Sequence, residues 1–149
     1  MTKIRITKEF NFEMAHALLG YDGKCSNIHG HSYHLTVTLI GEPSDKSSDP
    51  KNGMVMDFGE LKIIVNKEII EKFDHAFVIN ADTPDRDKFS SLPFFKKIIF
   101  LPYQPTCENM LADFSERINK SLPDAVKLHS LKLRETNDSY AEWFAEDNQ

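Results

Sequence analysis

Hydrophobic and polar residues alternate along two segments near the start of the chain, residues 4–16 and 29–40. The mostly apolar parity of the first segment ends at His16, and the parity that starts with His29 and His31 is apolar through the rest of the second. Strict alternation is the pattern of a β-strand with one buried face. The two segments therefore predict a hairpin in which His16, His29 and His31 meet at one end of the buried face.

The opposite parity of both segments is polar and predicts the exposed face of the same hairpin. It consists of Arg5, Thr7, Glu9, Asn11 and Glu13 in the first segment and Ser32, His34, Thr36 and Thr38 in the second. His34 is therefore expected on the face that points away from the other three histidines.

Two later segments have the apolar spacing of amphipathic helices. The first follows Asp57, a good N-cap residue with Glu60 three positions later, and is predicted over residues 58–72. The second follows Thr106, also a good N-cap residue, and stops before Pro123. Each helix has one apolar side, so both are expected to cover a sheet.

The remaining segments complete the predicted fold. Residues 126–136 and 140–145 are predicted as strands, and residues 76–79 as a short strand or extended turn. Two hairpins with two helices on one face indicate an α+β fold with an antiparallel four-stranded sheet. Residues 83–104 carry an apolar cluster interrupted by Pro93, and we expect a short helical insertion there that packs on a neighbouring subunit.

Composition narrows the class of protein. The content of 40% hydrophobic and 28% charged residues fits a single domain over residues 1–149. The net charge of -5 argues against a nucleic-acid partner, which needs a basic surface. No apolar run is long enough to cross a membrane and no signal peptide is recognisable, so we expect a cytoplasmic protein that binds no membrane. Cys25 and Cys107 are too few for a disulfide scaffold, and a bridge between them is not favoured.

The three histidines at one end of the predicted hairpin are candidate metal ligands. Neutral imidazoles from His16, His29 and His31, with a fourth position left open, make the ligand set of a catalytic zinc site. Cys25 lies four residues before His29 and has two alternative roles. It is either a fourth ligand that closes the site, or a thiolate acid/base beside the metal, which would lower the pKa of the thiol.

Five blocks of sequence, taken in order, resemble the superfamily of 6-pyruvoyltetrahydropterin synthase and 6-carboxytetrahydropterin synthase. The blocks are residues 12–16 together with Cys25 and 29–31, then residues 53–58, 73–75, 105–109 and 134–136. Three residues separate Cys25 from His29. This spacing resembles the 6-carboxytetrahydropterin branch, which feeds the synthesis of queuosine-type deazaguanines.

The resemblance implies a tunnelling fold, in which subunits join their sheets into a barrel as trimers that commonly stack into hexamers. The polar face of the first hairpin would then line the barrel, and active sites would lie at subunit interfaces. The implied reaction converts 7,8-dihydroneopterin triphosphate to 6-carboxy-5,6,7,8-tetrahydropterin, acetaldehyde and triphosphate. Two alternatives stay open: the 6-pyruvoyl reaction, which eliminates triphosphate but keeps all side-chain carbons, and a non-catalytic pterin-binding or zinc-stabilised module.

The same resemblance assigns roles to residues outside the metal site. Asp74 and His75 would form an acid/base relay with Cys25, in which the carboxylate orients the imidazole. The Glu135 carboxylate would accept two hydrogen bonds from a pterin ring, one from its 2-amino group and one from its N3–H. Glu135 is also expected to be a catalytic residue.

Thr106 and Glu108 would line the pterin pocket at the start of the second helix. Lys24, beside Cys25, is a candidate for contact with the triphosphate.

Overall fold

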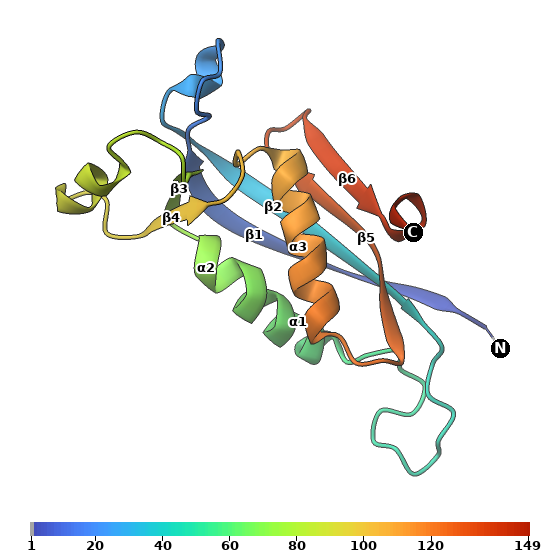
Figure 1. The fold of residues 1–149 in the computed structure, drawn as a ribbon. Coiled ribbons are helices and arrows are strands. Elements are labelled where there is room, and N and C mark those ends of the chain that lie inside the picture. Colours follow the sequence, from blue (N-terminus) through green and yellow to red (C-terminus); the bar gives the residue numbers. More distant parts are fainter. Residues whose placement is uncertain (1) are drawn as a thin grey trace.

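The computed structural model describes residues 2–149, and a long antiparallel hairpin runs through its centre (Figure 1). Strand β1 (Ile4–His16) pairs with β2 (His29–Gly41), and His16 lies directly opposite His29. The predicted hairpin and its register at the histidine end are confirmed. The two strands twist across the whole length of the molecule, so the histidines lie at one extremity of the sheet.

The hairpin is the middle of a six-stranded sheet with the order β4-β3-β1-β2-β5-β6. Strand β5 (Val126–Arg134) pairs antiparallel with β2, and β6 (Tyr140–Phe144) pairs antiparallel with β5, as expected. Strands β3 (Ala76–Asn80) and β4 (Ile98–Leu101) add parallel on the other side, next to β1. The α+β class is confirmed, but the predicted count of four strands is too small.

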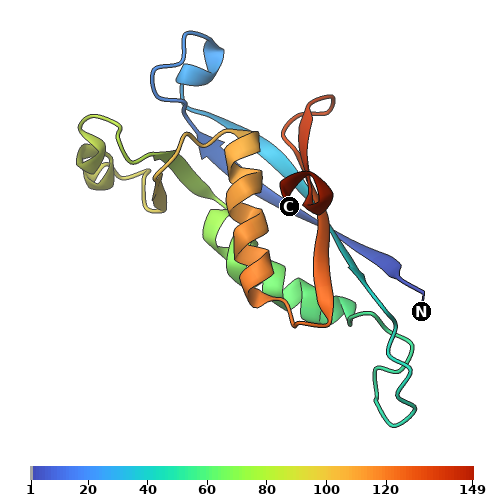
Figure 2. The same cartoon turned by 45° about the vertical axis from the view of Figure 1, so that its right-hand side comes forward.

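Strand β3 lies where a short strand or extended turn was predicted, whereas β4 lies within residues 83–104, where a helical insertion was predicted. Within residues 83–104, only Arg86–Ser91 form a helical turn, the 3₁₀ segment η3, which protrudes from the sheet (Figures 1 and 2). The prediction of a helical insertion over residues 83–104 is therefore partly wrong. Pro93 disfavours a longer helix, and the β-branched residues Ile98 and Ile99 extend the sheet edge instead.

Two helical segments cover one face of the sheet (Figures 1 and 2). Helix α1 (Phe58–Val65), a π-helical turn η2 (Asn66–Ile70) and α2 (Glu71–Phe73) follow one another without a break, and α3 (Cys107–Ser121) lies beside them. Their buried faces carry Leu61, Val65, Ile69, Phe73, Met110, Leu111, Phe114 and Ile118. No helix within residues 2–149 is both long and apolar enough to cross a membrane.

The face of the hairpin that points away from the helices is polar. Thr7 and Thr38 share a hydrogen bond across the two strands, at 2.9 Å between hydroxyl oxygens. The Ser32 hydroxyl donates to Glu13, and His34 lies 2.7 Å from Asn11 Oδ1. The expectation that His34 lies opposite the other histidines is confirmed.

Thr106 caps α3, as its sequence position predicts. Its Oγ1 accepts a hydrogen bond from the Asn109 N–H at 3.2 Å. Because this bond satisfies a helix N–H that has no intrahelical partner, we expect Thr106→Ala to lower the free energy of unfolding by about 1 kcal/mol. Urea unfolding measures the change, and Thr106→Ser, which keeps the hydroxyl, is the control. An equal loss in both variants would contradict the capping role.

Candidate metal centre and active site

Four side chains with metal-binding atoms meet at the histidine end of the hairpin. His16, His29, His31 and Glu135 each direct one such atom to a common point, and the four atoms all lie within 4.8 Å of one another. His16 is buried and the other three are half-buried. Glu135 reaches the group because it directly follows β5, the antiparallel neighbour of β2.

Backbone carbonyls fix the tautomers of two of these histidines. His16 Nδ1 lies 2.8 Å from the Pro105 carbonyl oxygen, and His29 Nδ1 lies 2.7 Å from that of Asn27. A carbonyl oxygen only accepts, so each Nδ1 carries the proton and each Nε2 presents a lone pair. The two Nε2 atoms face each other at 3.0 Å. Two lone pairs at this distance repel unless a cation lies between them, and nitrogen ligands of a tetrahedral zinc site are roughly 3.3 Å apart.

His31 adds a third nitrogen without a hydrogen-bond partner. Its Nε2 lies 2.8 Å from Glu135 Oε1, but the two are not aligned for a hydrogen bond, and no other partner exists among residues 2–149. Burial lowers the pKa of both His16 and His31, and this outweighs the opposite effect of the Glu135 carboxylate. The rings are therefore neutral near pH 7, the form that binds a metal. The residues present fit a divalent metal ion.

Glu135 was expected to hold a pterin, and the structure brings its carboxylate to the histidines. Besides the contact with His31, Glu135 Oε1 lies 3.7 Å from His16 Nε2. The group can thus offer three imidazoles with an open position, or a closed set with the carboxylate as fourth ligand. Pterin binding by Glu135 stays a prediction.

Cys25 stands apart from this group. It lies on a 3₁₀ turn, η1 (Lys24–Ser26), beyond the end of β1, and its half-buried thiol is free. Cys107 is also a free thiol, but it is buried, its Sγ donates to the Leu133 carbonyl, and burial raises its pKa to about 12. Cys107 is therefore a structural residue, and Cys25 is the accessible thiol of the two.

Asp74 and His75 form a contact pair at the junction of α2 and β3. Asp74 Oδ1 accepts a hydrogen bond from the Glu13 N–H at 2.9 Å and lies 3.0 Å from His75 Nδ1. These contacts, the Glu13 N–H first, lower the pKa of the Asp74 carboxyl. The His75 side chain is 77% exposed, so its ring is oriented by Asp74 but open to a substrate.

Within one chain, the Asp74–His75 pair and Cys25 are held beside different parts of β1 and of the loop that follows it. The His75 N–H donates to the Glu13 carbonyl, whereas the Cys25 carbonyl accepts from Leu18, beyond the end of the strand. Glu13 and His16 alone are separated by about 10 Å of extended chain. In Figure 1 the blue turn that holds η1 extends beyond the sheet, far from the junction of α2 and β3. The structure of a single chain does not bring Cys25 to His75.

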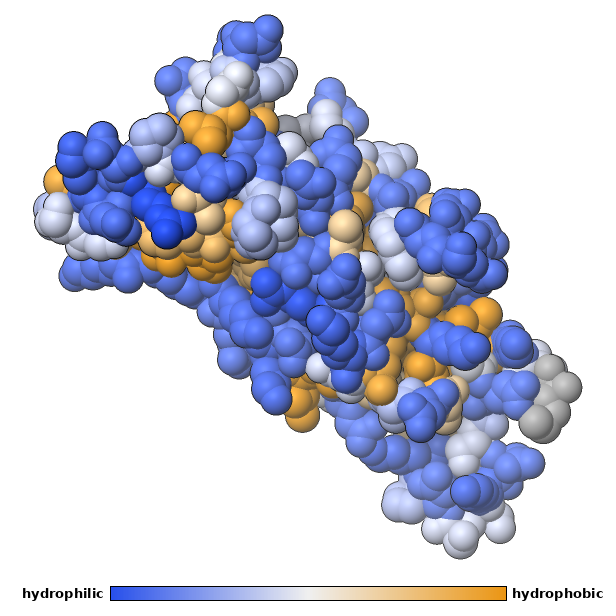
Figure 3. Space-filling view, viewed as in Figure 1, coloured by the Kyte–Doolittle hydropathy of each residue, from blue (hydrophilic) through white to orange (hydrophobic). Residues whose placement is uncertain are grey.

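A cavity of about 710 Å³ lies between the hairpin and residues 93–97, and both His31 and His75 contribute to its wall. Ser32 and Phe94 also line it. Phe94 is 91% exposed, and Figure 3 shows apolar surface over the neighbouring β4. The cavity is large enough for a small organic substrate.

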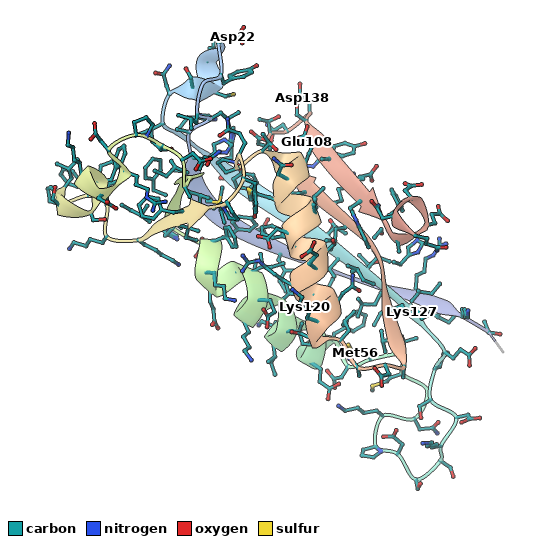
Figure 4. The ribbon with its side chains drawn as sticks, in the orientation of Figure 1. Asp22, Met56, Glu108, Lys120, Lys127 and Asp138 are labelled. Atoms are coloured by element: carbon teal, nitrogen blue, oxygen red, sulfur yellow. The ribbon has the colours of Figure 1, made fainter. Side chains whose placement is uncertain are left out.

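The first turn of α3 lies beside the metal group because the Pro105 carbonyl binds His16. Glu108 in this turn is exposed, and its carboxylate makes no hydrogen bond or ion pair with any residue that the structure describes. Figure 4 shows Glu108 at the same end of the molecule as the turn that carries Asp138. Thr106 is occupied as the helix cap, and Lys24 on η1 has no ion-pair partner within residues 2–149.

Tyr33 belongs to the site and was not predicted as such. It is fully buried, its ring stacks on Phe12 at 5.1 Å and meets the His16 and His31 rings edge-on. Its hydroxyl has no hydrogen-bond partner in the described part of the chain, and burial raises its pKa. The only signal in the sequence is its place in the apolar parity, two residues after His31.

We expect Tyr33→Phe to leave the free energy of unfolding unchanged or to raise it by up to about 1 kcal/mol, because a buried hydroxyl without a partner is costly. Urea unfolding measures this. Tyr103→Phe is the matched control, because the Tyr103 hydroxyl donates to Asp113, and its loss should destabilise the protein by about 1 kcal/mol. A loss above 1 kcal/mol in Tyr33→Phe would reveal a partner for its hydroxyl.

Solved structures with the same fold include two that cover nearly all of the chain. An uncharacterized protein from Wolinella succinogenes superposes with a TM-score of 0.78, at 21% identity over 97% of this chain and 99% of that one. The 6-pyruvoyl tetrahydropterin synthase of Caenorhabditis elegans superposes with a TM-score of 0.68, at 26% identity over 97% of both chains. The tunnelling fold is thereby confirmed.

Sequence comparison agrees over the same length. The chain is 36% identical to the 6-carboxy-5,6,7,8-tetrahydropterin synthase of Haemophilus influenzae, over 93% of this chain and 97% of that protein. It is 32% identical to the protein of the same name from Aquifex aeolicus, over 95% and 98%. Residues 5–146 match the family described as 6-pyruvoyl tetrahydropterin synthase. The chain, with its clustered histidines at the end of a tunnelling-fold hairpin, therefore belongs to the 6-pyruvoyl tetrahydropterin synthase family.

Proposed function

We propose that the protein is a zinc-dependent lyase that converts 7,8-dihydroneopterin triphosphate to 6-carboxy-5,6,7,8-tetrahydropterin, acetaldehyde and triphosphate. As a cytoplasmic enzyme it would serve queuosine synthesis. The observation that carries the proposal is the convergence of the Nε2 atoms of His16, His29 and His31 on one point. The shared name of the relatives that are 36% and 32% identical supports the choice of reaction.

The three histidines would hold zinc, which when bound polarises substrate hydroxyls and makes the protons on their carbons more acidic. Cys25, as a thiolate, would remove or return a proton on the substrate side chain. His75, oriented by Asp74 at 3.0 Å, would handle the second proton. Its ring is exposed and held by Asp74, so it is open to a substrate, which supports this role.

The complete relay would form between subunits of a homo-oligomer, a trimer or hexamer. In one chain the His75 N–H binds Glu13 within β1, whereas the Cys25 carbonyl binds Leu18 beyond the end of that strand, so a second copy would supply the missing partner. The fold family, in which sheets join edge to edge, supports such an assembly. The polar face of β1 and β2 would then line its interior.

The pterin ring would be fixed by the carboxylates at the start of α3 and the end of β5. The donor pair of the ring suits a single carboxylate. Glu108 is the better placed, since its carboxylate makes no hydrogen bond or ion pair within the described chain, and Glu135 lies against His31. Thr106, at the start of α3, would form part of the wall of the pterin pocket. Lys24, on the same turn as Cys25, would meet the triphosphate.

The product of purified, zinc-loaded protein with 7,8-dihydroneopterin triphosphate tests the proposal. Mass spectrometry of the pterin should show the 6-carboxy compound. A 6-pyruvoyl compound would assign the sister reaction instead. No turnover of the substrate by zinc-loaded protein would favour a binding module without catalysis.

A further inference from the structure

Lys97 directly precedes β4, and its side chain binds backbone carbonyls next to the Asp74–His75 pair. Its Nζ donates to the carbonyl oxygens of Glu71, at 2.7 Å, and of Asp74, at 2.6 Å. Both carbonyls lie at the C-terminal end of the α1–η2–α2 helical segment, where backbone oxygens lack intrahelical partners. A lysine ammonium is a suitable donor there because it also complements the negative end of the helix dipole.

The Asp74 carbonyl is one end of the peptide bond that sets the backbone angle of His75. The other end, the His75 N–H, donates to the Glu13 carbonyl at 2.6 Å. This single peptide unit is therefore held from both sides, by Lys97 at its oxygen and by Glu13 at its nitrogen. A peptide fixed at both ends cannot rotate without breaking one of the two bonds.

The backbone at His75 needs this support. His75 has a φ of 59°, in the left-handed region that residues other than glycine seldom adopt. Such a conformation persists only where its surroundings enforce it. Here it directs the imidazole back to Asp74 Oδ1, which is itself held by the Glu13 N–H.

Lys97 is in turn fixed by the sheet. Its carbonyl accepts from the Phe77 N–H at 2.9 Å, immediately before β4 begins at Ile98. Strand β4 pairs with β3, the strand that starts one residue after His75. The pairing of β4 with β3 thus places the Lys97 ammonium within reach of the Glu71 and Asp74 carbonyls.

We propose that Lys97 is a positioning residue for the Asp74–His75 pair, acting through the Asp74–His75 peptide and not through the substrate. This inference rests on the proposed function of His75 in catalysis. It assigns a role to the segment between η3 and β4 that its apolar composition does not suggest.

The test compares Lys97→Met with Lys97→Arg and with Lys120→Met in the zinc-loaded oligomer. Lys97→Met should lower kcat by about 100-fold with KM changed little, because a displaced acid/base group impairs the chemical step more than binding. Lys97→Arg, which still donates to two carbonyls, should recover most of the rate. Lys120→Met, at the far end of α3 in Figure 4, removes the same charge and should match the wild type.

The pH profile separates positioning from general damage. Lys97→Met should lose the limb of the kcat profile that His75→Ala also removes, whereas a merely structural defect lowers the whole profile evenly. Wild-type kcat in Lys97→Met, or an evenly lowered profile, would overturn the inference. If Lys97→Met does not fold, Lys97→Gln is judged by the same criteria. No turnover by the wild type would instead refute the proposed function itself.

Discussion

Replacing His16 with alanine is expected to remove the metal from the protein. His16 is the buried member of the group, and it presents Nε2 to His29 while the Pro105 carbonyl holds its Nδ1. Loss of a partner that only orients a ligand lowers metal affinity 10–100-fold, so loss of the ligand should exceed about 100-fold. Elemental analysis after dialysis against a weak chelator should find zinc in the wild type and almost none in His16→Ala.

His34→Ala is the matched control for this experiment. His34 belongs to the same hairpin, but it lies on the opposite face with Asn11 and Glu9. It should keep a full complement of zinc, and circular dichroism should show both variants folded. Stoichiometric zinc in folded His16→Ala would refute the three-histidine site.

Replacing Cys25 with alanine is expected to abolish turnover while the metal stays bound. Cys25 is not part of the group of metal-binding atoms, so the ligand set is intact without its thiol. Loss of a general acid/base typically costs about 10²–10⁴-fold in rate. His75→Ala should cause a loss of similar size for the same reason. Equal loss of zinc in Cys25→Ala would instead identify the thiol as a ligand.

Mixing these two inactive variants tests whether the relay forms between subunits. If Cys25 of one chain works with His75 of its neighbour, subunits that exchange at random regain about a quarter of the wild-type sites in a closed ring. Cys25→Ala mixed with His16→Ala is the control, because both residues then belong to the same side of each site and no activity should return. A Cys25→Ala and His75→Ala mixture that stays inactive after proven exchange would place the whole relay within one chain.

The histidine end of the hairpin was predictable because strand alternation is a local property. Parity alone placed His16, His29 and His31 on one face and His34 on the other, and the structure confirms this. The position of Glu135 was harder to predict, because it depends on the register between β2 and β5. That register shifts between Thr38 and Leu39, and no residue near this point indicates a β-bulge in the sequence.

The other edge of the sheet was not predictable in the same way. Short strands such as β3 and β4 are too brief for a clear period, and their parallel pairing depends on a long connection between them. The backbone angle of His75 leaves no trace in the sequence, because histidine does not favour a left-handed conformation as glycine does. The contact of Lys97 with backbone carbonyls depends on both features, so only the folded chain reveals it.

The central claim is that the metal held by the three histidines is required for a reaction that cleaves a carbon–carbon bond. The most direct measurement is the ratio of acetaldehyde to pterin product, made on metal-free protein and again after zinc is restored. We predict no product without metal, and one acetaldehyde per 6-carboxy product with it. Product formation by metal-free protein, or a pterin product without acetaldehyde, would contradict the account.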